Sequence, residues 1–256
     1  MGLIRSLIIA FSMYSKIPMP RFKWEERDLK YALGFFPLVG VSIGLVIYGW
    51  QYVCGLFGIV DLCRILITVA IPLIITGGIH ADGFMDTSDA FCSYQPRERK
   101  LEILKDPHIG AFAVISFAIY GLLYIAAFSQ IIDTDLLKII CAGFFLSRIL
   151  SGLAGVSFKG AKTEGMLFSF TSNTDKNAVR IFLLLQGILC IGFMIWTCVL
   201  PGLIVSASAL LSLVWYYFKC KKELGGITGD TEGYFLLICQ LLMALVAAGI
   251  NIFWMM

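Results

Sequence analysis

Three aspartates in one short segment have the residue types and spacing for chemistry. Asp82, Asp86 and Asp89 lie in GGIHADGFMDTSDAF, residues 77–91, at positions i, i+4 and i+7. At about 100° per helical residue, they fall within roughly 60° of one another on one face. Carboxylates crowded on one face repel unless a cation compensates, and hard oxygen ligands suit Mg²⁺ or Mn²⁺. The spacing predicts a metal site that holds a diphosphate during cleavage, with a solvated helix face as the alternative.

A histidine and a charged loop flank this cluster. His80 points away from the carboxylate stripe in helical phase, so a packing or capping role and a ligand role are both open. Lys105, Asp106 and His108 follow in RERKLEILKDPHIGAF, residues 97–112, beside a Pro and Gly break. This loop either places a cation on a substrate phosphate and a carboxylate near the metal, or simply anchors the chain at the membrane surface.

Further candidates lie downstream. Arg148 stands inside an apolar run, where an ionised guanidinium is costly and normally faces a polar cavity or a partner. Lys159 and Lys162 lie in FKGAKTEGM, and Thr228 and Asp230 lie in LGGITGDTEG. Glycine-rich turns of this kind can present backbone N–H groups to phosphate, although each could equally be an ordinary turn between spans.

The composition requires a bilayer around the elements that carry these residues. The chain has 256 residues, of which 59% are hydrophobic and 14% charged, whereas soluble domains have about 25% charged residues. We expect an all-α integral membrane protein that forms a single polytopic domain over residues 1–256. The run from 3 to 14 is too short to cross and predicts an interfacial or half-inserted helix, retained rather than cleaved. Seven apolar segments are long enough to span the membrane: 33–58, 62–81, 110–132, 136–156, 178–199, 201–218 and 233–255.

The distribution of basic residues predicts the orientation of these spans. Seventeen of the 20 Lys and Arg residues fall in the N-terminal segment and alternate connections, on one side of the membrane. This bias predicts a cytoplasmic N-terminus, an outside C-terminus and an active site on the cytoplasmic face. A net charge of +3 is too small to indicate nucleic acid, and the eight cysteines show no metal or disulfide spacing. The oligomeric state stays open, a homo-oligomer included.

Four ordered motifs give the chain a family resemblance: SKIPMP at 15–20, GGIHADGFMDTSD at 77–89, KDPHIG at 105–110 and GGITGD at 225–230. Over almost its whole length the chain resembles the cobalamin synthases, or adenosylcobinamide-GDP ribazoletransferases, of bacteria and archaea. Ala81, Ala90 and His108 depart from the family pattern. The third departure matters most, because a neutral imidazole supplies less charge than the arginine it replaces.

The resemblance implies a metal-dependent transfer in vitamin B12 biosynthesis at the cytoplasmic (inner) membrane. A ribose hydroxyl of α-ribazole or its 5′-phosphate would attack the cobinamide phosphorus of adenosylcobinamide-GDP and release GMP. Asp82 and Asp86 would bind Mg²⁺, and Asp89 would be a third ligand or the base. The motif residues that would contact substrate are His80, Lys105, Asp106, His108, Thr228 and Asp230. Arg148, Lys159 and Lys162 lie outside the matched motifs and are further candidate clamps for the substrate's negative charge. Two alternatives are a CDP-alcohol phosphotransferase and a cation transporter that uses the aspartates as an ion site.

Overall fold

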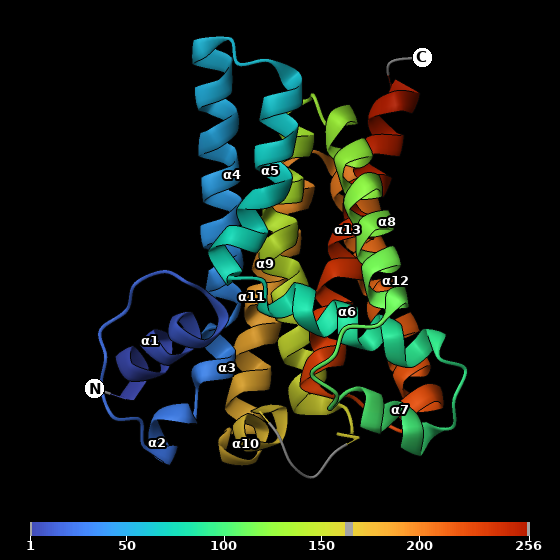
Figure 1. Ribbon diagram of the computed structural model, residues 1–256. Coiled ribbons are helices and arrows are strands. Elements are labelled where there is room, and N and C mark those ends of the chain that lie inside the picture. Colours follow the sequence, from blue (N-terminus) through green and yellow to red (C-terminus); the bar gives the residue numbers. More distant parts are fainter. Residues whose placement is uncertain (1, 162–165, 255–256) are drawn as a thin grey trace.

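The computed structural model describes residues 2–161 and 166–254, and this part of the chain folds into helices without a named strand (Figure 1). The helices are α1 (Gly2–Tyr14), α2 (Glu26–Leu29), α3 (Ala32–Phe35), α4 (Pro37–Phe57), α5 (Asp61–Thr76), α6 (Ile79–Cys92), α7 (Arg97–Ile103), α8 (Ala111–Gln130), α9 (Thr134–Ser157), α10 (Met166–Asn173), α11 (Lys176–Thr197), α12 (Val199–Leu224) and α13 (Gly229–Trp254).

Long apolar helices form the bundle and confirm the predicted fold class. Within the described residues, six helices are long and apolar enough to cross a membrane, and the bent pair α5 and α6 makes a seventh if it counts as one span. The six are α4, α8, α9, α11, α12 and α13. The predicted span 201–218 lies inside α12, which has 26 residues and therefore a length of about 39 Å. The chain is a multi-pass membrane protein.

Helix α9 is the centre of the bundle. It packs against α4, α11, α12 and α13, and 78% of its most apolar window is buried inside the protein. Phe144, Leu146 and Ile149 on this helix are at most 1% exposed. A helix that is apolar all round belongs in such a position, because every face has a neighbour to pack against.

A sharp bend after α5 corrects the predicted second span. The sequence predicted a span over 62–81 that carries the aspartates at its tip, but α5 ends at Thr76 and α6 leaves it at 94°. Gly77 and Gly78 make the turn with φ of +64° and +80°, the left-handed region that glycine adopts without strain. At 1.5 Å per residue, α5 covers about 24 Å, less than the 30 Å hydrocarbon thickness. The aspartates therefore lie on a separate helix across the bundle.

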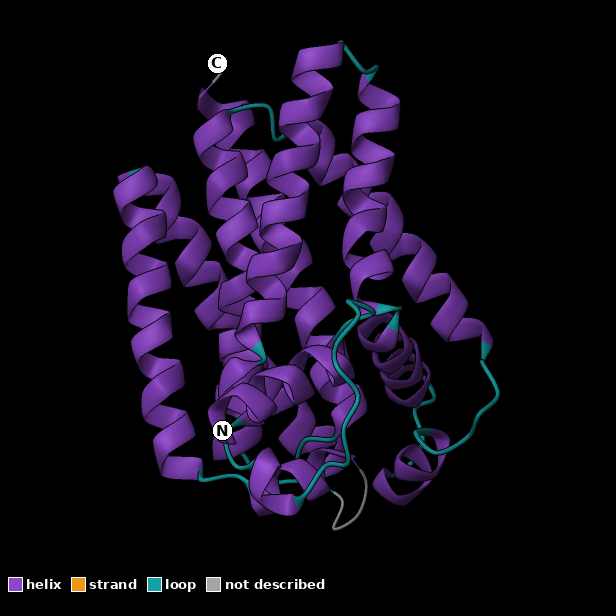
Figure 2. Cartoon of the chain, turned by 90° about the vertical axis from the view of Figure 1, so that its left-hand side faces the viewer, coloured by secondary structure: helices purple, strands orange, loops and turns teal. Residues whose placement is uncertain are grey.

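The two ends of the bundle differ. The short helices α1, α2, α3, α7 and α10 gather at the end that carries the N-terminus, and α13 finishes at the opposite end (Figure 1). The longer loops also lie at the first end (Figure 2). The predicted N-terminal helix is α1, which packs against α2 and α3. After it, the backbone N–H of Lys16 donates to the Ile75 carbonyl at 2.7 Å, which fixes the N-terminal segment beside the α5–α6 bend.

Candidate active site at the crossing of α6 and α13

Two glycines let α6 and α13 cross with their backbones in contact. A Cβ atom on Gly83 would lie 2.7 Å from the backbone oxygen of Asp230, and one on Gly233 would lie 2.8 Å from that of His80. Any side chain at either position would push the helices apart. The crossing thus joins the segment 77–89 to the segment 225–230, which are far apart in the sequence.

The crossing forms one wall of a cavity of about 190 Å³ into which both motifs contribute a carboxylate. Asp82 is exposed and Asp230 is half-buried, and an oxygen of Asp230 lies 3.4 Å from the donating Thr228 hydroxyl. The remaining lining comes from α1, α3, the residue between α3 and α4, α9 and the same two helices: Tyr14, Leu33, Phe36, Ile79, His80, Gly83, Ser151, Gly155, Gly229, Glu232, Gly233 and Leu236. The lining therefore combines acidic side chains with aromatic and aliphatic ones.

The carboxylates around this cavity fit a cation that shares its coordination with a substrate. No three His, Cys, Asp or Glu side chains of the described chain converge as a ready metal cage. Mg²⁺, however, typically takes one or two carboxylates, keeps waters and binds substrate phosphates. Asp82 and Asp230 line the same cavity, and Asp86 follows Asp82 by one helical turn and is half-buried. This donor set suits a cation that arrives with a diphosphate.

Asp89 has a structural partner at the start of α8. One carboxylate oxygen accepts the backbone N–H of Gly110 at 2.7 Å, and the other accepts that of Ala113 at 2.8 Å. These N–H groups belong to the first turn of α8, where the helix itself offers no acceptor. Asp89 therefore caps α8 from a different helix and fixes the end of the 104–110 loop beside α6.

His80 packs against aromatic side chains and borders the cavity. Its ring lies 6.2 Å from Tyr14, stacked, and 5.8 Å from Phe36, edge-on. It is buried, and its Nε2 atom has no hydrogen-bond partner among the described residues. The histidine packs against these two aromatic rings, which contact each other, and also lines the cavity that contains Asp82.

The predicted phosphate loop is exposed and is held to α6 through Asp89, near the C-terminal end of that helix. Lys105, Asp106 and His108 are all exposed. The His108 backbone N–H and its Nδ1 lie 3.0 and 2.6 Å from one oxygen of Asp106. Both hydrogen bonds hold the pKa of the Asp106 carboxyl below its usual range, and the backbone N–H has the larger effect. His108 thus contacts Asp106, and Lys105 is available at the surface.

Arg148 lies outside the cavity of the aspartates. It is 1% exposed in α9, donates from Nη1 to the Phe144 carbonyl at 3.0 Å, and has no partner at Nε. It lines a second cavity of about 110 Å³ together with His80, Tyr120 and Tyr124. His80 borders both cavities, so Arg148 stands behind the histidine and not at the acidic wall.

The two glycine-rich loops pair with each other. The Ala161 N–H donates to the Ile227 carbonyl at 2.8 Å, and the Ile227 N–H donates to the Lys159 carbonyl at 2.9 Å. Lys159 is exposed on this paired segment, whereas Lys162 lies outside the described residues. The Thr228 hydroxyl accepts the Thr231 N–H at 3.2 Å, which caps the first turn of α13.

Glu232 is a cavity residue that the sequence reasoning missed. It is 8% exposed, and one of its oxygens accepts a hydrogen bond from the hydroxyl of Ser151 on α9, while Oε1 has no partner within residues 2–161 and 166–254. A signal was present, because an acidic residue that opens a long apolar run is costly unless it has a function or a partner. Its acidic neighbour in the same motif, Asp230, made it look like part of a polar loop.

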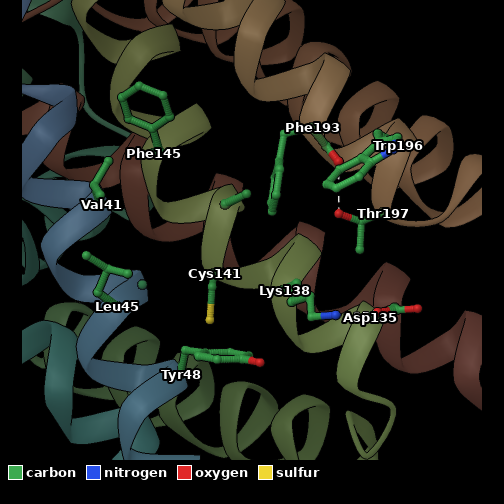
Figure 3. Close-up of a pocket in the computed structure, with 12 residues that line it drawn as sticks. Val41, Leu45, Tyr48, Asp135, Lys138, Cys141, Phe145, Phe193, Trp196 and Thr197 are labelled. Carbon is green, nitrogen blue, oxygen red and sulfur yellow. Dashed lines mark hydrogen bonds and ion pairs between the residues drawn. The ribbon is translucent and has the colours of Figure 1, made fainter.

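A larger groove of about 670 Å³ lies elsewhere, between α4, α9 and α11 (Figure 3). Its lining is mostly aromatic and aliphatic, and its charges are Asp135 and Lys138, which pair at 2.8 Å. It lies toward the end of the bundle opposite α1 and shares no residue with the acidic cavity. Size alone would select this groove, but it lacks the unpaired polar groups of a reaction site.

Fold and site together define a multi-pass membrane protein with an acidic cavity at one end of its helix bundle. A family model described as cobalamin-5-phosphate synthase matches residues 6–248. The chain belongs to this family, and the resemblance drawn from the four motifs is confirmed, as is its assignment to the enzymes of cobalamin biosynthesis.

Curated relatives match the chain nearly end to end. A protein of Lachnoclostridium phytofermentans named adenosylcobinamide-GDP ribazoletransferase is 42% identical, covering 98% of this chain and 97% of its own. Proteins with the same name from Clostridium perfringens and Halalkalibacterium halodurans are each 32% identical, with at least 90% of both chains covered. No solved structure matches the chain.

Proposed function

We propose that this protein transfers the cobinamide phosphate group of adenosylcobinamide-GDP to α-ribazole or its 5′-phosphate and releases GMP. The observation that carries the proposal, beside the family membership, is that Asp82 and Asp230 of separate motifs line one cavity at the α6–α13 crossing. A ribose hydroxyl of the acceptor attacks the phosphorus next to cobinamide. The bond from this phosphorus to the GMP oxygen breaks, and the cavity carboxylates are the available acceptors for the hydroxyl proton.

The carboxylates of α6 and α13 would hold the donor's diphosphate through Mg²⁺, with Mn²⁺ as a substitute. Asp82 and Asp86 of α6 and Asp230 of α13 are the ligands we propose. The cation, when bound, neutralises the charge of the diphosphate and of the departing GMP. Asp89 holds the 104–110 loop to α6, and its two accepted N–H bonds favour this positioning role over a role as third ligand or base.

Exposed cations near the cavity end of the bundle would bind the outer phosphate and the nucleotide. Lys105 and Lys159 are exposed on loops at this end, and Lys162 remains a candidate outside the described residues. Arg148 is buried behind His80, so we propose that it supports this histidine and does not clamp phosphate. The helix cap made by Thr228 keeps Asp230 at the crossing.

We further propose that the cavity opens to the cytoplasm, with the N-terminus inside and the C-terminus outside the inner membrane. The basic residues of the N-terminal segment and of α7 belong to the end that carries α1, which supports this orientation by the positive-inside bias. The family membership favours the transferase over the two alternatives, a CDP-alcohol phosphotransferase and a cation transporter.

The direct test uses purified protein in nanodiscs with adenosylcobinamide-GDP and α-ribazole or its 5′-phosphate, and measures GMP release and the joined product. Asp82→Asn and Asp230→Asn should each abolish release without loss of membrane insertion. Asp61→Asn is the matched control, because Asp61 pairs with Arg64 at the opposite end of the bundle. Full turnover by either cavity variant, or ion flux without any GMP release by the wild type, would overturn the proposal.

A further inference from the structure

Glu232 places an unpaired acceptor inside the acidic cavity. One of its oxygens accepts the hydroxyl hydrogen bond of Ser151, which fixes the side chain between α13 and α9. The other, Oε1, is buried and has no hydrogen-bond partner in the described part of the chain, although the residue lines the same cavity as Asp82 and Asp230. Leaving a buried acceptor without a hydrogen bond is unfavourable, so a donor from outside the protein is expected at this atom.

The surroundings of Oε1 identify the kind of donor. The carboxylates of Asp82 and Asp230 repel a bare phosphate, which would therefore bind together with a cation at the exposed Asp82. A hydroxyl group, by contrast, donates well to a carboxylate oxygen. Tyr14 and Phe36 line the same cavity, and their ring centroids are 4.3 Å apart. Aromatic walls of this kind pack against a flat ring by stacking or edge contacts.

We propose that this cavity receives the acceptor nucleoside, and that Oε1 of Glu232 accepts a hydrogen bond from one of its ribose hydroxyl groups. The inference rests on the proposed function and adds to it the place of the acceptor. The aromatic base packs against Tyr14 and Phe36, and the ribose lies between Glu232 and the pair Asp82 and Asp230. This arrangement brings a sugar hydroxyl toward the position where the donor's diphosphate is held.

Binding measurements with sugar analogues test the hydrogen bond without any turnover. Calorimetry would compare α-ribazole with its 2′-deoxy and 3′-deoxy forms on the wild-type protein in nanodiscs, in the absence of the donor. One deoxy form is expected to bind about tenfold more weakly than α-ribazole, because it leaves Oε1 of Glu232 buried without a hydrogen bond. The substitution Glu232→Gln weakens this acceptor. In this variant, the difference in affinity between α-ribazole and the deoxy form should fall to about threefold or less.

Matched controls separate the hydrogen bond from a general loss of structure. Glu102→Gln changes an exposed glutamate that pairs with Arg99, and it should keep the full penalty for the deoxy form. Ser151→Ala removes the other partner of Glu232 but keeps Oε1, so the penalty should persist even if the affinity for α-ribazole falls.

Several results would overturn the inference. Equal wild-type affinity for all three nucleosides would mean that water satisfies Oε1, and this measurement does not depend on whether any variant folds. An unchanged penalty in Glu232→Gln would place the recognised hydroxyl at another residue. The wild-type assay of GMP release reports separately on the proposed function, so an active enzyme with no Glu232 effect refutes only the place of the acceptor.

Discussion

The contact between the backbones of α6 and α13 can be tested with a single methyl group. In Gly83→Ala, the new Cβ would lie 2.7 Å from the Asp230 carbonyl oxygen, whereas ordinary contacts begin at 3.4 Å. The helices must separate by about 0.7 Å, and overpacking of this kind costs about 1–3 kcal/mol. A displacement approaching 1 Å between groups that act together can cost about 10²-fold in rate. We therefore expect GMP release to fall roughly 10- to 100-fold while the protein still inserts.

The matched control is Gly249→Ala on α13, because a Cβ atom there meets nothing within 4 Å. This substitution removes the helix penalty of glycine, about 1 kcal/mol, so stability should be unchanged or higher. The assays are GMP release and the midpoint of thermal unfolding in the same nanodiscs. If Gly83→Ala retained wild-type activity and midpoint, the crossing could not be the element that positions Asp82 against Asp230, and the site would have to be rebuilt.

Three further predictions follow from contacts at the same end of the bundle. Asp89→Ala removes both acceptors at the start of α8, so it should cost about 1–2 kcal/mol and lower the unfolding midpoint by about 5 °C, and an unchanged midpoint would argue against the cap. Glu223→Gln should lower the free energy of unfolding by about 3 kcal/mol, because Lys100 is buried against Glu223 and would lose its charge partner. The double variant that also carries Lys100→Met should recover most of this stability. Chelation by EDTA should abolish GMP release and added Mg²⁺ should restore it, and activity that survives chelation would remove the metal from the mechanism.

Apolar length and the motif spacing predicted most of the bundle but misplaced the acidic helix. Spans such as α8 and α9 follow from long hydrophobic runs, which have one low-energy place in a bilayer. The run 62–81 was predicted to be one span because its residues up to Ile79 are mostly apolar. The bend at Gly77 and Gly78 depends on left-handed backbone angles that hydropathy does not encode.

The site shows the same division between local and tertiary information. Helical spacing correctly placed Asp82 and Asp86 one turn apart on a single helix. It could not show that Asp89 reaches the first turn of α8, since that contact depends on how α6 and α8 pack. Asp230 joins Asp82 only through the glycine crossing. Only the packing of α9 against α13 shows that one oxygen of Glu232 has a hydrogen bond and the other has none.

The bend after α5 also explains how a carboxylate-rich site can belong to a membrane domain. Had α6 continued the axis of α5, it would have extended beyond the bundle, with Asp82 far from the first turn of α13. Turned by 94°, it lies across the bundle and exposes Asp82 to the aqueous end, while Phe84 packs into the core. Charged groups avoid the hydrocarbon in this arrangement, and the polar start of α13 meets them there. Replacing Gly77 by a β-branched residue such as valine, which disfavours φ of +64°, should therefore impair activity more than insertion.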